Sequence, residues 1–254
     1  MRVVDCLVHL HSRTYLEAHV GRHDPPLAER RGDGYLFHRD RVASETILPS
    51  FLELDVQLDE LDAQGVDVAV SSFGAFSVDH LPVPQATELA MHLNHERAEL
   101  ERSFPGRFYG LALLPMQDAQ AAIETLEHAV RTLSLRGVCV PSIVAPPHEQ
   151  SARRLVYQRI GDLGVPLFVR SAPRATIQHV LAGAPGLTVV APRRGDRLPC
   201  LVQWTARHSE RVLFASGYPY RSAADGLDRI CGALPDPELE AVLSLNAIGL
   251  LGLN

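Results

Sequence analysis

Two histidines near the start of the chain, His9 and His11, are placed where they could take part in chemistry. Both belong to an apolar run, residues 3–11, that reads as a buried strand. Side chains two positions apart on a strand lie on the same face. Imidazoles at the C-terminal end of a barrel strand are common ligands of divalent metals. The chain has 12 histidines, however, so a chance pair fits the spacing as well.

Alternating strands and helices are expected to position these histidines. Apolar, strand-like runs occur at residues 3–11, 66–72, 108–115, 137–141, 165–170, 187–191 and 212–216. Helical patterns occur at residues 50–65, 84–104, 118–133, 150–163, 174–184 and 237–251, with a short helix near Trp204, and Asp118 is expected to be an N-cap. Strands that are continuously apolar predict a parallel sheet covered by helices. Seven strand-helix units fit an open sheet and a shortened barrel equally well.

Residues 12–49 interrupt this alternation. They are polar and rich in Arg, Asp, Pro and Gly, and they predict a long irregular loop after the first strand. Loops of this length in a compact domain are usually functional or disordered. We expect a lid over the C-terminal ends of the strands, from which His38 could reach a bound molecule or merely be solvated.

Composition limits the kinds of partner. A chain of 254 residues with 46% hydrophobic content can form a single domain, residues 1–254. Its formal charge of −6, without a basic block, argues against nucleic acid and favours a small molecule. Four cysteines without CxxC spacing predict free thiols in a reducing compartment. The sequence has no long apolar segment of the kind that would predict secretion or membrane insertion, so a cytoplasmic location is expected.

Several motifs, in order along the chain, resemble a known family. They are Asp5-x-x-x-His9 and residues 61–67, 107–115, 135–138, 214–219 and 246–253. Together they resemble the amidohydrolase-related branch that includes aminocarboxymuconate semialdehyde decarboxylase and resorcylate decarboxylases. The resemblance implies an α/β fold, a distorted and shortened TIM-like (β/α) barrel, with its site at the C-terminal ends of the strands. One strand-helix unit, next to last, is expected to be missing, which leaves seven clear units.

The same resemblance implies a metal site that this chain has altered. The family pattern has a His-x-His on strand one, a histidine closing strand five, an acid–base histidine after strand six and an aspartate closing the last strand. At these positions the chain has Leu7, His9, Arg170, Arg193 and Gly217. Because a divalent ion needs several imidazole or carboxylate donors, we predict no metal and no cofactor. Pairing His9 with His11 instead would repair strand one alone.

The altered pocket is predicted to bind a small anion. Arg170, Arg193 and Arg194 would place permanent positive charge near the lost metal, and a guanidinium grips a carboxylate with two hydrogen bonds. Asp5 or Asp196 could pair with these arginines instead, without a ligand. The remaining candidates for substrate contact, by their positions at strand ends or in the first loop, are His11, His38, Ser142, Ser216, Tyr218 and Arg221.

Two functions of different class follow. In the first, the protein is a metal-independent enzyme with lyase, cyclase or hydrolase chemistry on a small carboxylated, aromatic or polyketide-like acid. His9, Arg170 and Arg193 would be catalytic. The arginines would hold the carboxylate, and His9 would move a proton, since a histidine titrates near neutrality. In the second, His9 is kept for packing and the barrel is an inactive ligand-binding or partner-stabilising protein. We favour the enzyme, because a decayed site fills with small or apolar residues more often than with arginines. The resemblance also implies a homodimer.

Overall fold

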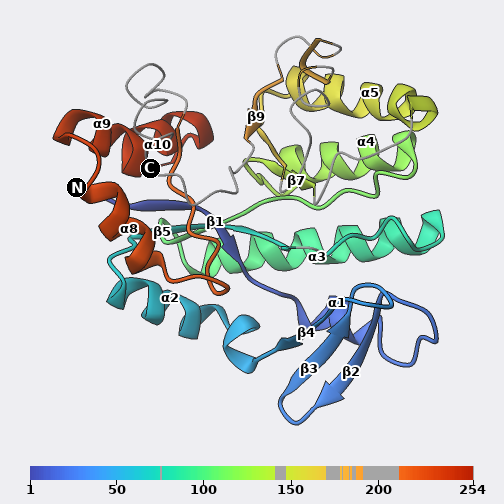
Figure 1. Ribbon diagram of the computed structural model, residues 1–254. Helices are drawn as coiled ribbons and strands as arrows, with labels where there is room; N and C mark the ends of the chain where they lie inside the picture. The colour runs from blue at the N-terminus through green and yellow to red at the C-terminus, as the bar shows by residue number, and fades with distance from the viewer. Residues whose placement is uncertain are drawn as a thin grey trace.

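The computed structural model describes residues 1–74, 76–140, 147–169, 178, 180–182, 184, 187–190 and 212–253. For residues 147–152 and 190 it describes the backbone alone. Parallel strands occupy the middle of the molecule and helices surround them (Figure 1). Three of these strands form one sheet in the order β1(Val4–His9), β5(Val68–Ser72), β6(Phe108–Gly110), and three form another in the order β7(Val138–Val140), β8(Leu167–Val169), β9(Val189–Val190).

The two parallel sheets are joined edge to edge. A parallel bridge pairs Ala112, just after β6, with Val138 of β7. The Ala112 N–H donates to the Gly137 carbonyl at 2.8 Å, and the Cys139 N–H donates to the Ala112 carbonyl at 2.9 Å. The six strands therefore continue one another in chain order, as a TIM-like barrel requires.

Residues 212–217 lie on the other side of β1. The Cys6 N–H donates to the Phe214 carbonyl at 2.9 Å, and the Gly217 N–H donates to the Leu7 carbonyl at 3.1 Å. The strand predicted at residues 212–216 is therefore extended and beside β1, but it is not a regular strand. The Phe214 N–H donates to the Val242 carbonyl and the Ser216 N–H donates to the Asp5 side chain, so neither donates to the backbone of β1.

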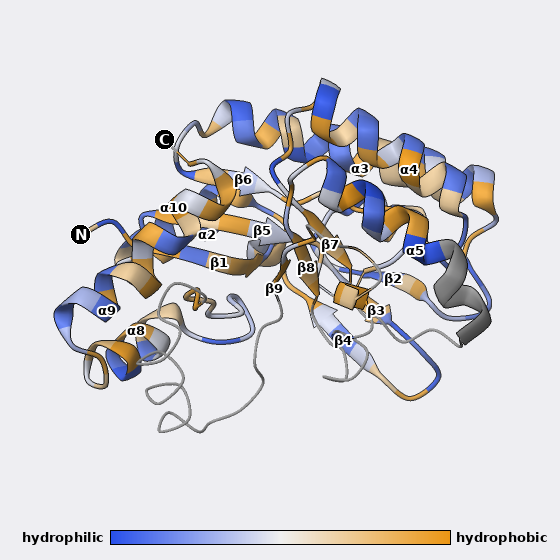
Figure 2. Ribbon diagram, turned by 90° about the horizontal axis from the view of Figure 1, so that it is seen from above, coloured by the Kyte–Doolittle hydropathy of each residue, from blue (hydrophilic) through white to orange (hydrophobic). Residues whose placement is uncertain are grey.

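Helices cover the sheets largely where the sequence predicts them. They are α2(Leu54–Ala63), α3(Val83–Ser103), α4(Ala119–Glu127), α5(Pro147–Asp162), α8(Ala223–Cys231), α9(Asp236–Glu240) and α10(Asn246–Leu251), with π-helical turns at His128–Thr132 and Ala241–Leu245. Asp118 is the N-cap of α4, as predicted, and accepts a hydrogen bond from the Ala121 N–H. Helices α3, α4 and α5 lie on one side of the strands and α8 and α9 on the other (Figure 2). The helices predicted at residues 174–184 and near Trp204 lie wholly or mostly outside the described residues.

Each central strand is buried on both faces. Val4 and Cys6 of β1 pack with Val68 and Val70 of β5 and with Leu251 of α10, on the inner side. Val8 of β1 and Ala69 of β5 instead belong to a cluster with apolar residues of α2, as expected for a parallel sheet with two covered faces. Among the described residues, no helix combines the length and apolar character needed to cross a membrane.

Residues 12–49 are not the irregular loop that the sequence predicts. They form α1(Arg13–Glu17), a 3-10 turn at Pro49–Phe51 and an antiparallel sheet in the order β2(Leu27–Arg31), β3(Gly34–His38), β4(Ser44–Ile47). The prediction was wrong because the outer face of this sheet is so polar that it hides the alternation. The buried face carries Ala28, Tyr35, Phe37 and Ile47, which pack together in one apolar cluster.

Candidate functional site

The end of β1 brings His9 and His11 to the same place in the molecule. The His9 N–H donates to the Tyr218 carbonyl at 2.7 Å, and the His11 N–H donates to the Phe51 carbonyl at 2.9 Å. The pairing of β1 with β5 is irregular between positions 5 and 8. Residues far apart in the sequence thus fix the backbone that carries the two histidines.

Two buried polar side chains hold the carbonyls of the same segment. Gln57 of α2 donates through Nε2 to the His9 carbonyl at 3.2 Å, and Arg97 of α3 donates to the Leu10 carbonyl. The Arg97 guanidinium also lies over the Phe73 ring, 4.1 Å from its centroid. Burial lowers the pKa of Arg97 to about 10, so it remains charged at neutral pH. These contacts leave the backbone of β1 little freedom at its C-terminal end.

His9 is buried and faces a hydroxyl. Its Nδ1 lies 2.8 Å from Ser72 Oγ, at the end of β5. The Gly74 N–H donates to the same oxygen at 3.3 Å, so the Ser72 proton is available for His9 Nδ1. That arrangement would leave the His9 proton on Nε2.

His11 is also buried and contacts a tyrosine. Its Nε2 lies 2.6 Å from Tyr220 Oη, and that oxygen lies 3.3 Å from Glu45 Oε2 of β4. The imidazole packs between aromatic rings, with centroid distances of 4.5 Å to Phe76 and 6.1 Å to Phe51. Tyr220 is 45% exposed. The cluster formed by His9, Ser72, His11, Tyr220 and Glu45 therefore reaches solvent at Tyr220.

Gly74 has no side chain, which allows the rings of His9 and His11 to lie close to its backbone. Its φ of +63° is in the left-handed region that glycine adopts readily. A Cβ at this position would lie 3.1 Å from His11 Cε1 and 3.7 Å from His9 Nδ1. A side chain here would therefore crowd His11.

Asp5 ties β1 to the segment beside it. The Ser216 N–H donates to Asp5 Oδ1 at 3.0 Å and the Ser216 hydroxyl donates to Oδ2, while the Leu7 N–H donates to Oδ1 at 3.1 Å. Burial raises the pKa of Asp5, and the hydrogen bonds from Ser216 and Leu7 oppose that rise. Ser216, predicted to contact substrate, is thus engaged with a buried carboxyl group.

The other two candidates near the last strand are Tyr218, whose carbonyl accepts from the His9 N–H, and Arg221. Tyr218 is buried, and its hydroxyl donates to Glu60 of α2. Arg221 is exposed. The neighbouring Tyr220, by contrast, lies against the rings of both His9 and His11.

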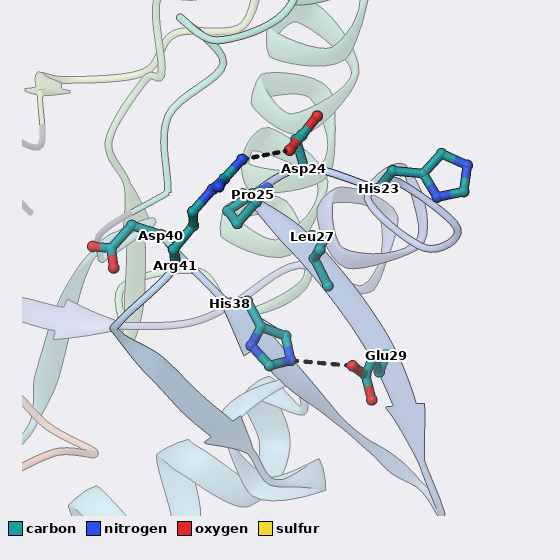
Figure 3. A pocket seen from close by; sticks show the side chains of 8 residues that line it. All are labelled: His23, Asp24, Pro25, Leu27, Glu29, His38, Asp40 and Arg41. Carbon is teal, nitrogen blue, oxygen red and sulfur yellow. Dashed lines mark hydrogen bonds and ion pairs between the residues drawn. The ribbon is translucent and has the colours of Figure 1, made fainter.

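His38 is separated from His9 and His11 by the antiparallel sheet. It follows Phe37, which packs 4.8 Å from the Phe76 ring, and successive residues of a strand face opposite sides. His38 lines a cavity of about 300 Å³ on the outer side, where its Nε2 lies 3.2 Å from Glu29 Oε1 (Figure 3). An ion pair of Arg41 with Asp24, 3.3 Å apart, lines the same cavity.

Four predicted site residues lie outside the described residues: Ser142, Arg170, Arg193 and Arg194. Arg170 is the residue that follows β8 in the sequence. Its role as an anion-binding residue therefore stays a prediction from the sequence, as do those of Arg193, Arg194 and Ser142.

The described residues do not fit the metal site that the resemblance implies. Leu7 and Gly217 stand at two ligand positions, and neither has a donor side chain. Asp5, the nearest carboxyl group on β1, already accepts the hydrogen bonds of Ser216. Within the part of the chain that the structure describes, no three or more His, Cys, Asp or Glu side chains are grouped to hold a metal ion.

Sequence reasoning missed Ser72 and Glu45, and it assigned Tyr220 only a role in shaping the turn after the last strand. Ser72 had a usable signal, because it ends a predicted strand and parallel strands end at the same edge of a sheet. Tyr220 had one as well, its place between the predicted residues Tyr218 and Arg221. Glu45 had none, since it is 34 positions from His11 and is brought to it by the tertiary structure alone.

Comparisons of sequence identify relatives with a common chemistry. A family model described as amidohydrolase matches residues 4–193. The 2-amino-3-carboxymuconate-6-semialdehyde decarboxylase of Dictyostelium discoideum is 30% identical over 117 residues, which is 45% of this chain and 33% of that protein. The gamma-resorcylate decarboxylase of Rhizobium sp. (strain MTP-10005) is 36% identical over 87 residues, 34% of this chain and 27% of that protein. The matches thus span a third or less of the length of these curated relatives.

Solved structures share the fold over the whole chain. The 2,6-dihydroxybenzoate decarboxylase from Rhizobium superposes with a TM-score of 0.73 at 18% identity, covering 100% of this chain and 99% of that one. The 5-carboxyvanillate decarboxylase from Sphingomonas paucimobilis superposes with a TM-score of 0.80 at 15% identity, again covering 100% and 99%. These similarities confirm the predicted α/β, TIM-like fold.

Proposed function

Because this chain belongs to the amidohydrolase family, we propose that it is a lyase that acts on a small aromatic carboxylate without a divalent metal. The observation that carries the proposal is the pairing of two buried imidazoles with hydroxyl groups at the end of β1. His9 lies against Ser72 and His11 against Tyr220, at distances of 2.8 and 2.6 Å. The matched relatives are decarboxylases by name, which favours a carboxylated substrate.

The proposed reaction is loss of carbon dioxide from the ring. The ring carbon that bears the carboxylate gains a proton, the bond to the carboxylate breaks, and its electron pair returns to the ring as carbon dioxide leaves. His9 would move a proton during this exchange, and positioned proton transfer contributes about 10²–10⁴-fold to rates. Arg170 and Arg193 would supply fixed positive charge for the carboxylate and for negative charge that develops on the substrate.

Metal independence is tested by elemental mass spectrometry of protein purified without chelators or added metals. We expect no stoichiometric metal, and carbon dioxide release from 2,6-dihydroxybenzoate or 5-carboxyvanillate that EDTA does not reduce. Stoichiometric zinc or manganese, removed by EDTA together with activity, would overturn the proposal. The His95→Gln variant controls for adventitious metal, because His95 and His128 present exposed Nε2 atoms 3.0 Å apart.

The role of His9 is tested by His9→Gln. We expect kcat to fall by about 10²–10⁴-fold while the protein stays folded. His92→Gln is the matched control, since His92 is an exposed residue of α3 with 64% of its side chain accessible. Wild-type turnover by His9→Gln would show that His9 is not the proton-transfer group.

An inactive binding protein is the second candidate. It is favoured by the same contacts, because both imidazoles already have hydroxyl neighbours and a packing role accounts for them. In that case calorimetry would detect binding of the aromatic acids with no carbon dioxide released by the wild type. His9→Gln would then change only affinity or stability.

A further inference from the structure

We propose that Tyr220 is a second proton-transfer residue of this site, paired with His11 and coupled through its hydroxyl to Glu45. This inference rests on the proposed function and deepens it. A ring that exchanges a carboxylate for a proton needs a group that delivers the proton at the ring carbon. His9 is one titratable group of the cluster, and Tyr220 is the group that lies at its exposed side.

The position of Tyr220 supports this role. Its ring centroid lies 5.6 Å from that of His9 and 5.9 Å from that of His11. The two histidines are only 5% and 2% exposed, whereas Tyr220 is 45% exposed. Tyr220 is therefore the member of the cluster that a molecule arriving from solvent would meet first.

Among the described residues, His11 and Glu45 lie within hydrogen-bonding distance of the Tyr220 hydroxyl, which carries a single proton. His11 Nε2 lies 2.6 Å from Oη and Glu45 Oε2 lies 3.3 Å from it. A carboxylate can only accept, so when Tyr220 donates to Glu45 its oxygen is open to the N–H of His11. When Tyr220 loses its proton, the same N–H can donate to the phenolate, and hydrogen bonds to a charged form favour that form.

Glu45 reaches this position because of the sheet that follows β1. In the pairing of β3 with β4, Phe37 lies opposite Glu45, so both side chains project from the same face. Phe37 is buried against Tyr15 and Phe76, which fixes that face toward the end of β1. The antiparallel sheet thus contributes one carboxylate to the cluster.

The proton-transfer step balances with water as the only further reactant. The O–H bond of Tyr220 breaks and a C–H bond forms at the ring carbon that bears the carboxylate. The bond from that carbon to the carboxylate then breaks, its electron pair restores the aromatic ring, and carbon dioxide leaves. The phenolate, held by the N–H of His11, regains a proton from water at its exposed side.

The principal test is Tyr220→Phe, which keeps the ring and removes the hydroxyl. We expect kcat to fall by about 10²–10⁴-fold with KM nearly unchanged, because the substrate-binding surface is retained. Tyr35→Phe is the matched control: it removes another tyrosine–carboxylate hydrogen bond, from Tyr35 to Glu17 at 2.5 Å, in the same sheet and away from the histidines. A variant Tyr220→Phe with wild-type kcat would overturn the proposal.

A second measurement does not depend on turnover. In protein labelled with ¹⁵N at histidine side chains, the Nε2 signal of His11 and its titration should change in Tyr220→Phe and not in Tyr35→Phe. Among the described charged groups, Glu45 is linked to His11 through the Tyr220 hydroxyl and Arg97 donates to the adjacent Leu10 carbonyl, so Glu45→Gln should shift the same titration. An unchanged His11 signal in Tyr220→Phe would overturn the pairing.

The two measurements separate the two proposals. If the His11 titration changes in Tyr220→Phe but the wild type releases no carbon dioxide, the Tyr220–His11 pair is supported. Only the lyase proposal is then overturned. Carbon dioxide release that persists in Tyr220→Phe would support the lyase and overturn the role of Tyr220.

Discussion

Gly217 occupies the position at which the family pattern has a metal-binding aspartate, and its backbone differs from what an aspartate prefers. Its φ is +78°, and a Cβ built there would meet no atom within 4 Å. Space is therefore available for a side chain, but the left-handed conformation disfavours one. Leu7, at another ligand position, is almost fully buried. Leu7 and Gly217 thus both lie in the hydrogen-bonded region around Asp5 and Ser216.

Backbone strain at position 217 predicts a loss of stability. Gly217→Ala should lower the free energy of unfolding by about 1 kcal/mol, measured by urea denaturation. Gly249→Ala is the control, because Gly249 lies in α10 with no atom within 4 Å of a Cβ and no positive φ. That control should be neutral or stabilising, since alanine favours helices. Equal stability of Gly217→Ala and the wild type would contradict the strain.

A second pair of histidines predicts a dependence of stability on pH. His19 Nδ1 lies 2.6 Å from the Tyr15 carbonyl, so it carries the proton, and Nε2 must accept from His80 Nε2 at 2.7 Å. The His19 ring is therefore neutral. Burial, with smaller effects of the charges on His19 and Arg22, lowers the pKa of His80 to about 4, and burial lowers the pKa of His19.

Folding should therefore weaken as the pH falls. The unfolded chain takes up protons at these histidines below about pH 6.5, whereas the folded chain resists them until its lower pKa values are reached. The free energy of unfolding should accordingly decrease between about pH 6.5 and pH 4. Denaturation across this range should show a shallower decrease in His80→Gln, whose amide can still donate to His19, and an unaltered one in His92→Gln. Equal slopes in His80→Gln and the wild type would exclude this pair as the cause.

At the scale of elements, the sequence predicted the parallel strands and the helices between them well. Long apolar runs and amphipathic patterns arise wherever a sheet is covered on both faces, so residues 66–72 and 84–104 were recognisable. The antiparallel sheet was missed because its strands are short and one face is polar. Its first turn, Gly32-Asp33 between β2 and β3, was a usable hairpin signal. His9 was found because the apolar run at residues 3–11 predicted the strand β1, and His9 is its last residue.

The turn after β5 is the element most closely tied to the histidines, and it predicts a selective effect of one methyl group. Gly74→Ala should lose about 1 kcal/mol of stability through its positive φ and should also displace His11, whose Cε1 lies 3.1 Å from the added carbon. Gly21→Ala is a matched control, with a φ of +81° and no atom within 4 Å. Both variants should lose stability, but only Gly74→Ala should alter the His11 NMR signals and turnover. Identical spectra for the two would contradict the contact.

At the scale of the whole molecule, the poor fit of the described residues to a metal site predicts how stability responds to metals. A native site saturated at 100 times its dissociation constant would add about 2.7 kcal/mol. We expect zinc, manganese and EDTA to leave the unfolding midpoint unchanged. A rise that persists in His95→Gln, which lacks the exposed imidazole pair, would point to a metal site elsewhere in the chain.

Strand β1 lies between β5 and residues 212–217, so its two neighbours are synthesised at very different times. Asp5 is bonded to Ser216, 211 positions later. At about 5–20 residues per second, tens of seconds pass between synthesis of the strand and synthesis of its neighbour. During that interval the N–H and C=O groups along one edge of the first strand lack their native partners. The nascent chain should therefore depend on chaperones more than a protein of equal size whose neighbouring strands are made in succession.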